Sequence, residues 1–568
     1  MVTSPTIAYL SMELALDPGM PTYSGGLGIL AGDTMRAAAD LGLPMVGVTL
    51  LHRKGYFRQH LDERGNQSES DYDWQPEELL EPLAPRVLLS LSGRWVHVQA
   101  WRYLVRGISG TVPVYFLDTA LPENDPVDQG LTDHLYGGDS RYRLYQSAVL
   151  GLGGIAMLRA LGHHGVQVYH MNEGHSALAP LALLEERMWG QGLSAAASAD
   201  REAVFQRCVF TTHTPMPAGH DRYPLGMVCD VLGKERSDFL EAAQCCPDGT
   251  LDMTNLALKF SRYINGVSMR HEAVSHSIFP QYPINSVSNG VHAATWTSPP
   301  FSQLYDRYIP EWRRDNLYLR YAVGIPLGEI RQAHSGAKQQ LLLEIERRTG
   351  VALDPAALTL GFARRATAYK RSDLLFSDVE RLKQIAGQAG PFQVIYGGKS
   401  HPRDEAGRAL IRRIFQAAEA LKGIVPVIYL EEYDMALAKY LCAGVDLWLN
   451  TPQKPQEASG TSGMKAALNG VPSLSTMDGW WIEGHVEGVT GWSIGDGWRS
   501  ESNREREVAS LYDKLENVIL PMYYRQAEAY VRLRRSAIAV NGSYFNAQRM
   551  LLQYLRNAYA AAGELESA

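Results

Sequence analysis

LTLGFARRATAYKRSDLLFSDVERLKQIAGQAGPFQVIYGGKS, residues 358–400, contains two short apolar runs with a longer helical stretch between them. The apolar runs, 358–363 and 392–398, are predicted strands, and 372–387 is a predicted helix. A strand, a helix and a second strand in this order are the building unit of a parallel sheet that is covered by helices. The sequence therefore predicts an α/β fold.

The same alternation continues on both sides of this unit. Further helices are predicted at 31–42 and 336–350. Further strands are predicted at 6–10, 43–51, 166–171, 203–213 and 284–289 in the first half, and at 424–430, 445–450 and 471–477 in the second. Two series of strands indicate two doubly wound, Rossmann-like domains.

The strand series pauses between about residues 297 and 355, in a stretch rich in Trp, Tyr and Arg that leads into a long predicted helix. This pause divides the chain. We expect an N-terminal domain over 1–300, a linker and connecting helix over 301–355, a C-terminal domain over 356–505, and C-terminal helices over 506–568 that pack back across both domains.

Size, charge and cysteine content restrict the class of protein. A chain of 568 residues is too long for one hydrophobic core, and 45% hydrophobic and 20% charged residues are ordinary for a soluble globular protein. The formal net charge of −7 argues against a nucleic-acid or anionic-membrane partner. Five cysteines without metal-ligand spacing, no signal-peptide pattern and no apolar stretch of about 18 residues favour a cytoplasmic protein.

Polar, charged or glycine-rich residues follow many of the predicted strands. Six such strand ends are YLSMEL (9–14), MNEGHS (171–176), TTHTP (211–215), FARRATAYKR (362–371), YGGKSHP (396–402) and LEEYD (430–434). In open α/β sheets, ligands bind beyond the carboxyl ends of the strands. Six ends of this kind on two domains predict a ligand-binding cleft between the domains.

The segment QEASGTSGMKAALNG, residues 456–470, is a glycine-containing loop that runs into a short predicted helix. Backbone N–H groups and the positive end of a helix dipole make such loops anion sites. It is not a nucleotide P-loop, because Gly460 and Gly463 lie too close together and Ala466 stands where a magnesium-binding Ser or Thr is required.

Two functions remain open for Lys465 in this loop. It can act as a point charge beside a phosphate, or as a Schiff-base lysine for pyridoxal 5′-phosphate (PLP), with residues 459–461 near the cofactor phosphate. Glu457 can bind substrate hydroxyls or cap the helix.

Two motifs rich in cations or glycines also have two interpretations each. In RRATAYKR (364–371), Arg365 and Lys370 can clamp a phosphate, or the segment is a solvated basic turn; Lys399 adds a cation beyond a neighbouring strand. In PTYSGGLGILAGD (21–33), the glycines can direct N–H groups at a ligand, or form an ordinary strand-to-helix turn.

Histidines follow two of the predicted strands. In HMNEGH (170–175), the spacing of His170, Glu173 and His175 matches no zinc motif, so hydrogen bonding to a polar substrate is favoured over a metal site. His213 can contact a ligand or serve as a buried structural histidine.

Taken together, EASGTSGMK, RRATAYKR, YSGGLGILAGD, YLSMEL and MDGWWIEG resemble the α-glucan (glycogen/maltodextrin) phosphorylase family, in its short bacterial or archaeal-type form. The similarity runs from residue 7 to about residue 485. It implies a GT-B fold of two Rossmann-like domains that face each other across a cleft. It also implies PLP-dependent, retaining transfer of a terminal glucosyl unit from an α-1,4-glucan to inorganic phosphate, which gives α-D-glucose 1-phosphate.

The resemblance assigns a role to each candidate residue. Lys465 corresponds to the Schiff-base lysine, and Arg365 and Lys370 correspond to ligands of the substrate and cofactor phosphates. His213 resembles the histidine whose main-chain carbonyl stabilises a developing oxocarbenium ion. The implied cofactor site comprises Lys465, Arg364, Lys370, Gly460, Thr461, Tyr433 and Gly26. The implied substrate site comprises Gly25, Gly26, Leu27, Asn265, His213, Glu457, Ser459, Gly460, Tyr369, His175 and Glu13, and no metal is implied.

The chain departs from the long members of this family at several places. Those members carry an N-terminal extension for phosphorylation and nucleotide control; here the first predicted strand begins at residue 6, and we expect no such regulation. Ser24 replaces an asparagine before the double glycine, Ala15 replaces a tyrosine near the cofactor, and SGM (462–464) replaces GNM. Family members are often homodimers, so a homodimer is compatible with the resemblance.

Two other functions are weighed against a phosphorylase. A nucleotide-sugar-dependent GT-B glucan synthase usually has a lysine before the N-terminal double glycine, where this chain has Ser24, and it has no use for a Schiff-base lysine. A non-catalytic glucan-binding relative would be expected to lack Lys465, Arg365 or Lys370, but all three are present.

Overall fold

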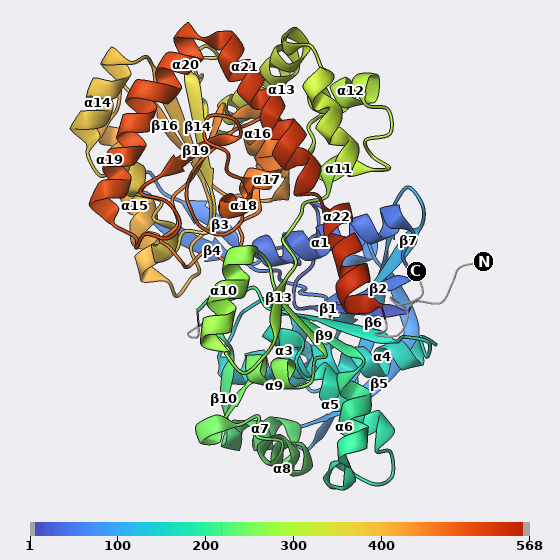
Figure 1. Cartoon of the computed structure of the whole chain (residues 1–568). Helices are drawn as coiled ribbons and strands as arrows, with labels where there is room; N and C mark the ends of the chain where they lie inside the picture. Colours follow the sequence, from blue (N-terminus) through green and yellow to red (C-terminus); the bar gives the residue numbers. More distant parts are fainter. Residues whose placement is uncertain (1–5, 217–218, 561–568) are drawn as a thin grey trace.

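The computed structural model describes residues 6–216 and 219–560 of the chain. It is a mixed α/β structure with two large sheets, one from strands within residues 7–286 and one from strands within residues 358–494 (Figure 1). The predicted α/β class is therefore confirmed. Over the described ranges, no helix is long and apolar enough to cross a membrane.

The first sheet has nine strands in the order β13-β12-β9-β8-β1-β2-β7-β6-β5. Pairing is parallel from β13 to β7, and β6 and β5 add an antiparallel edge. Because β1 lies between β8 and β2, the strand order reverses there, which leaves a crevice at the carboxyl ends of β1 and β8. The strands are β1 (Ile7–Ser11), β2 (Met45–Leu50), β5 (Glu81–Leu91), β6 (Arg94–Arg106), β7 (Thr111–Asp118), β8 (Val168–Asn172), β9 (Cys208–Thr211), β12 (Tyr263–Gly266) and β13 (Ile284–Ser286).

The second sheet has six strands, all parallel, in the order β16-β15-β14-β17-β18-β19. The order reverses between β14 and β17, so this sheet also has a crevice at its carboxyl edge. The strands are β14 (Leu358–Ala363), β15 (Phe392–Gly397), β16 (Val427–Leu430), β17 (Leu447–Asn450), β18 (Ser473–Thr476) and β19 (Gly491–Ile494). Two small antiparallel pairs complete the sheets, β3 (Arg58–Leu61) with β4 (Gln67–Ser70) and β10 (Arg222–Pro224) with β11 (Thr250–Asp252).

Helices connect the strands and cover the sheets (Figure 1). Those in the first part of the chain are α1 (Gly26–Leu41), α2 (Pro126–Gln129), α3 (Ser140–Ala148), α4 (Gly154–Ala160), α5 (Ala179–Arg187), α6 (Ser198–Phe205), α7 (Leu225–Leu232), α8 (Lys234–Ala242), α9 (Met253–Lys259), α10 (Met269–Ile278), α11 (Ala293–Trp296) and α12 (Pro299–Tyr308). Those that follow are α13 (Leu327–Thr349), α14 (Val379–Gln388), α15 (Glu405–Ala420), α16 (Met435–Gly444), α17 (Ser462–Ala467), α18 (Trp481–Gly484), α19 (Arg504–Lys514), α20 (Leu520–Arg525), α21 (Ala527–Ser536) and α22 (Ala547–Tyr554).

The predicted segment 203–213 is only partly a strand. Helix α6 occupies its first residues and β9 begins at Cys208. In the two large sheets, strands β5, β6, β7, β12 and β19 have no counterpart in the sequence prediction, and neither do the four strands of the small antiparallel pairs. For β5 and β6 the reason is physical, since many of their side chains are exposed on one face and the strands lack a continuous apolar run.

The predicted helix 372–387 begins later than its pattern suggested. Asp378 is the N-cap of α14, and its side chain accepts a hydrogen bond from the N–H of Arg381. A short 3₁₀ turn, Leu374–Phe376, occupies the residues before it. The segment RRATAYKR contains a second 3₁₀ turn, Ala368–Lys370.

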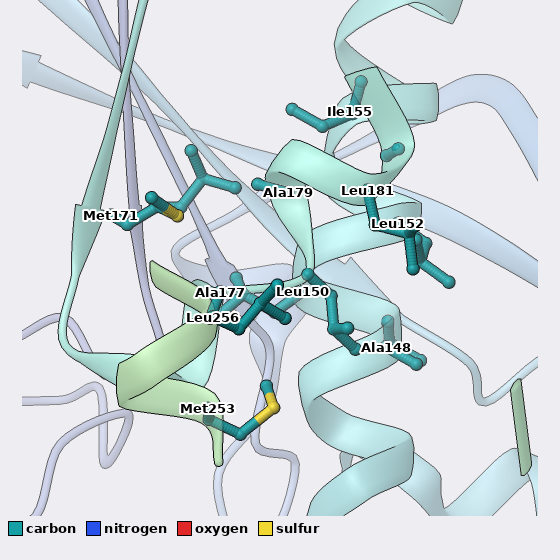
Figure 2. Packing of buried hydrophobic residues seen from close by; sticks show 14 of the residues in the cluster. Ala148, Leu150, Leu152, Ile155, Met171, Ala177, Ala179, Leu181, Met253 and Leu256 are labelled. Carbon is teal, nitrogen blue, oxygen red and sulfur yellow. The ribbon is translucent and has the colours of Figure 1, made fainter. Parts of the chain in front are cut away.

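The first sheet is packed on both faces. Figure 2 shows Leu150, Ile155 and Leu181 from the helices of one face together with Met171 of β8 and Leu256 of α9, all buried in one apolar cluster. A second apolar cluster, on residues of α1 and α22, packs with residues of β7 and β9. Burial on both faces explains why β1 and β2 consist largely of apolar residues.

A buried carboxylate, Asp446, joins three elements at the base of the second sheet. It accepts hydrogen bonds from Lys338 Nζ (2.6 Å) and His334 Nε2 (2.9 Å) of α13 and from Arg534 Nη2 (2.5 Å) of α21. Burial alone would raise the pKa of Asp446, but Lys338, His334 and Arg534 hold that pKa well below the usual range of a carboxyl. The connecting helix and the C-terminal helices are thus tied to the strand edge by one charge cluster.

Replacing Asp446 by Asn is expected to lower the free energy of unfolding by about 3–5 kcal/mol, because it leaves buried cations without their counter-charge. Urea unfolding at pH 7 measures the change. The matched control is Asp496→Asn, which removes an exposed partner 3.2 Å from Arg506 and is expected to cost less than about 1 kcal/mol.

The pH dependence of the free energy of unfolding gives a second test of Asp446, again by comparing the wild type with Asp446→Asn. Because folding depresses the pKa of Asp446, its stabilisation is complete above the ordinary carboxyl pKa of about 4 and is lost as the pH falls below it. The stability difference between the wild type and Asp446→Asn should therefore shrink on acidification. An Asp446→Asn chain as stable as the wild type at pH 7 would contradict this role.

Candidate active site

A cavity of about 600 Å³ lies where loops from the carboxyl ends of both sheets meet. Loops that follow β1, β8 and β9 supply one wall, and loops that follow β14, β15, β16 and β17 supply the other. Of the residues that the family resemblance assigns to the site, all but Asn265 line this cavity: Glu13, Gly25, Gly26, Leu27, His175, His213, Arg364, Arg365, Tyr369, Lys370, Tyr433, Glu457, Ser459, Gly460, Thr461 and Lys465.

Glu457 is the central anion of the second wall. Its Oε2 accepts from Arg364 Nη2 (2.6 Å) and from Lys370 Nζ (2.5 Å). Burial raises the pKa of Glu457, but Arg364 and Lys370 outweigh burial and lower that pKa to about 2. The carboxylate of Glu457 is therefore ionised. The backbone of Glu457 is also held in place, because its N–H donates to Asp478 Oδ2 (2.9 Å).

The cavity retains positive charge beyond this cluster. The Glu457 carboxylate carries one negative charge, whereas its two partners, Arg364 and Lys370, carry two positive charges. Arg365 lines the same cavity and, within the described ranges, makes no ion pair and no side-chain hydrogen bond. The ammonium group of Lys370 also lies 4.5 Å from the ring centroid of Tyr369. This positive charge favours the binding of an anionic ligand at this wall.

The glycine loop of the first wall is held by Glu13. The Glu13 carboxylate accepts from the N–H groups of Ser24 (2.6 Å) and Gly25 (3.3 Å) and from the hydroxyl of Tyr136 (3.0 Å). Helix α1 begins directly afterwards, and its first i→i−4 bond runs from the Ile29 N–H to the Gly25 carbonyl (3.2 Å). The earlier N–H groups of α1 therefore point out of the helix, toward the side that lines the cavity.

Only glycine fits where this loop approaches Glu13. A Cβ on Gly28 would lie 2.6 Å from Tyr23 Cβ and 2.7 Å from Glu13 Oε2. The glycines of PTYSGGLGILAGD thus allow the start of α1 to pack against the end of β1. The functional interpretation of this motif gains support, because Gly25, Gly26 and Leu27 all line the cavity.

Lys465 projects from α17 into a buried position. Its Nζ lies 3.8 Å from the ring centroid of Trp296, and the indole N–H of Trp296 donates to Asp33 Oδ2 (2.7 Å). Burial lowers the pKa of Lys465, which favours the neutral amine that can attack a carbonyl carbon. Within the described part of the chain, the Lys465 ammonium has no hydrogen-bond acceptor.

His213 is fixed by two neighbours at the end of β8. Its N–H donates to Glu173 Oε2 (2.7 Å), and its ring Nε2 lies 2.6 Å from Asn172 Oδ1. Burial lowers the pKa of His213 to about 4, so the ring is neutral near pH 7. The ring Nε2 of His213 is hydrogen-bonded to Asn172, whereas no described donor reaches the main-chain carbonyl of His213. This carbonyl is therefore free to contact a ligand in the cavity.

The assignment of Asn265 to the substrate site is wrong. Asn265 is fully buried beneath the C-terminal helix, where its Oδ1 accepts from Thr211 (2.9 Å) and its Nδ2 donates to Tyr554 (3.0 Å) and to the Gly266 carbonyl (2.9 Å). The reason is tertiary: α22 brings Tyr554 against Asn265 of β12, although the two residues lie far apart in the chain.

A different asparagine lines the cavity. Asn289 is 4% exposed, and its Oδ1 has no hydrogen-bond partner among the described residues. Its backbone is fixed by its own N–H to the Val267 carbonyl (3.1 Å) and by Arg549, whose Nη2 donates to the Asn289 carbonyl (2.9 Å). The Ser459 hydroxyl is likewise buried, in the cavity wall and without a partner in the described structure. Unpaired buried polar atoms of this kind are expected where a polar ligand binds.

Two further residues from the sequence prediction have structural partners. Lys399 lines the cavity, but its Nζ pairs with Glu432 (2.6 Å) and donates to the Phe57 carbonyl (2.8 Å), so its charge links the two halves of the structure. His170 lies away from the cavity and contacts the hydroxyls of Tyr559 (2.6 Å) and Thr211 (2.8 Å).

Asn289 and Trp296 are among the cavity residues that sequence reasoning missed, and it did not predict that Glu173 anchors a loop. Asn265 and Asn289 are each followed by a glycine, and the sequence alone cannot rank the two. Trp296 lies in the segment that connects the two strand series and has no local signal of function.

The fold and the cavity define an α/β protein with a buried lysine and clustered cations suited to an anionic ligand. The model of the carbohydrate phosphorylase family matches residues 234–491. Over 98% of its length, the chain is 37% identical to the maltodextrin phosphorylase of Thermococcus litoralis, 36% identical to the glycogen phosphorylase of Mycobacterium tuberculosis and 35% identical to the glycogen phosphorylase of Aquifex aeolicus. The matches cover 70%, 71% and 86% of those proteins. The chain belongs to the carbohydrate phosphorylase family.

The two asparagines should respond differently to the same substitution. Asn265→Ala removes three hydrogen bonds in the interior and is expected to lower the free energy of unfolding by about 1–3 kcal/mol. Asn289→Ala removes a side chain with no partner for its Oδ1 and is expected to stay within about 0.5 kcal/mol of the wild type. Urea unfolding of the two variants side by side tests this; the reverse order of stabilities would contradict the assignment.

Proposed function

We propose that this chain is a PLP-dependent α-1,4-glucan phosphorylase, a glycosyltransferase. It transfers a terminal glucosyl unit from glycogen or maltodextrin to inorganic phosphate, with retention, and gives α-D-glucose 1-phosphate. The observation that carries the proposal is the convergence of Arg365, Lys370 and the start of α1 around one cavity that also contains Lys465. The names of the relatives, glycogen phosphorylase and maltodextrin phosphorylase, support the same reaction.

The two parallel sheets also support the finer proposal of a GT-B fold. In this arrangement, Rossmann-like domains over 1–300 and 356–505 face each other across the cavity. Residues 301–355 connect them, and the helices after residue 505 return to the first sheet, where Arg549 binds the Ser288 and Asn289 carbonyls.

The residues of the cavity fit PLP. Lys465 is buried beside the ring of Trp296 and would hold the cofactor through its amine, and Tyr433 lines the same cavity. Gly460 has a φ of 74°, and a Cβ there would lie 3.2 Å from Arg364 Nη2, so only glycine leaves room for a phosphate beside Arg364. When bound, PLP supplies a phosphate group that exchanges a proton with the substrate phosphate.

The cations have a clear electrostatic task in this reaction. Two unit negative charges 4 Å apart repel by about 4 kcal/mol at an effective dielectric constant of about 20. Arg365 is unpaired in the described structure and can bind inorganic phosphate in the bidentate manner of a guanidinium. Lys370 and the free N–H groups at the start of α1 add positive potential on either side.

The polar groups around these cations suit a sugar. Glu457 is ionised and acts only as a hydrogen-bond acceptor, so it can accept hydrogen bonds from the hydroxyl groups of the substrate. Ser459 and Asn289 offer buried atoms without partners, and Asn289 takes the role that the sequence assigned to Asn265. The carbonyl of His213 can direct its negative end at the positive charge that develops on the anomeric carbon.

The first experiment asks whether PLP is attached to Lys465. We expect the purified protein to show the absorbance and fluorescence of bound PLP, and borohydride reduction with peptide mapping to locate it on Lys465. Lys465→Ala should lose both the cofactor and the formation of glucose 1-phosphate from maltodextrin and phosphate. Lys422→Ala, at a lysine whose side chain is 74% exposed, should keep both.

A wild-type protein that takes up no PLP would overturn the proposed function. Consumption of a nucleotide sugar with glucan elongation would instead identify a glucan synthase. Glucan binding without turnover by the PLP-loaded protein would identify a non-catalytic relative.

The role of Arg365 is tested by its effect on one substrate. A charge-assisted hydrogen bond contributes about 1.5–3 kcal/mol, so Arg365→Leu should raise the KM for phosphate about 10- to 100-fold, with little change in the KM for maltodextrin. Initial-rate kinetics with each substrate varied measure this. Arg365→Lys keeps the charge and should recover part of the loss; an unchanged KM for phosphate in Arg365→Leu would contradict the assignment.

A further inference from the structure

We propose that Glu173 is a positioning residue, whose carboxylate holds residues 213–214 so that the main-chain carbonyl of His213 faces the glucosyl site. The inference rests on the proposed function for the part that concerns catalysis. The geometric part, that Glu173 anchors this loop, stands on contacts within the structure.

The backbone of Glu173 is the first observation. Its φ of 72° and ψ of 164° lie in a region that is occupied almost only by glycine. Residues in such conformations persist where the surrounding structure enforces them, and they cluster at functional sites. Glycine at this position would adopt the same backbone without strain, so a glutamate here must be explained by its side chain.

The side chain supplies that explanation. Oε2 accepts from the His213 N–H (2.7 Å) and from the Thr214 hydroxyl (2.9 Å), and Oε1 accepts from the Gly174 N–H (3.0 Å). The strained backbone turns the side chain away from β8 and toward the loop after β9. Glu173 is 6% exposed, and its exposed part belongs to the cavity wall.

The other anchors of this loop are weaker or hold a different group. The Thr214 N–H reaches Thr212 Oγ1 only at 3.4 Å, and His220 Nε2 lies 3.4 Å from the Thr214 carbonyl. Asn172 holds the imidazole of His213 but not its peptide groups. Among the described residues, Glu173 therefore makes the shortest contact to the backbone of residues 213–214.

The charge of Glu173 strengthens these bonds. Burial raises the pKa of Glu173, but His213 and His175, which carry positive charge when protonated at acidic pH, and the two N–H donors outweigh burial, so the pKa lies below that of an ordinary Glu. An ionised carboxylate accepts through both oxygens and forms short bonds to N–H groups. Glutamine has only one acceptor oxygen, and its NH₂ group would face one of the three donors.

The decisive experiment separates strain from function with Glu173→Gly. Glycine relieves the backbone strain, which offsets the hydrogen bonds lost with the carboxylate, so we expect a melting temperature close to that of the wild type. We expect kcat to fall at least 10-fold while the PLP content and the KM for phosphate stay the same. A residue with a merely structural role would lose stability and activity together.

Companion variants sharpen the comparison. Glu173→Gln keeps one acceptor and should have an intermediate kcat. The matched control is Asp248→Gly, which relieves a positive φ of 55° at an exposed acidic residue outside the cavity and should leave kcat unchanged. A wild-type kcat in Glu173→Gly, or a melting temperature that falls in proportion to activity, would overturn the proposal.

Hydrogen–deuterium exchange tests whether Glu173 anchors the loop, and this measurement does not depend on catalytic activity. The amide of His213 should exchange at least 10-fold faster in Glu173→Gly than in the wild type, whereas the amides of β8 should keep their rates. Exchange at the wild-type rate would overturn the inference whatever the activity. If the wild type takes up no PLP and forms no glucose 1-phosphate, the proposed function fails, and the exchange result still decides whether Glu173 anchors the loop.

Discussion

The arrangement of the cavity depends on one shared carboxylate. Glu457 binds Arg364 and Lys370 at the same oxygen, and in doing so joins the loop after β14 to the loop that carries Ser459 and Gly460. The pair is buried, so removal of the carboxylate would leave two cations uncompensated. Because Glu457 neutralises only one charge of the two, and Arg365 stands beside them unpaired within the described residues, the wall keeps the positive potential that an anionic ligand requires.

Three carboxylates organise donors around the cavity in the same way. Glu13 holds the Ser24 and Gly25 N–H groups before α1, Glu173 holds residues 213–214, and Glu457 holds the cations of the second sheet. In each case a fixed negative charge satisfies some donors and leaves neighbouring groups free toward the cavity. Such preorganisation has a physical advantage, since the polar groups need not reorient when charge develops in a substrate.

Much of the fold could be predicted because its signals are local. β14 occupies the predicted segment 358–363, and β2, β15 and β17 lie within theirs, since strands buried on both faces are largely apolar. The exposed edge strands β5 and β6 carry no such run, and the N-cap Asp378, rather than apolar spacing, decides where α14 begins. For the site, the motifs at strand ends led to a common cavity because parallel strands place their carboxyl ends on one edge.

The sequence by itself determined the α/β class, the family resemblance and the lysine loop, because each of these is written in contiguous residues. The tertiary structure alone decided which asparagine lines the cavity, since Asn265 is hydrogen-bonded to Tyr554 of α22, whereas Asn289 Oδ1 has no partner among the described residues. It also decided which cations stay available, because Glu432 pairs with Lys399 while no described carboxylate reaches Arg365. Pairing and burial depend on residues far apart in the chain, and only the packed fold brings them together.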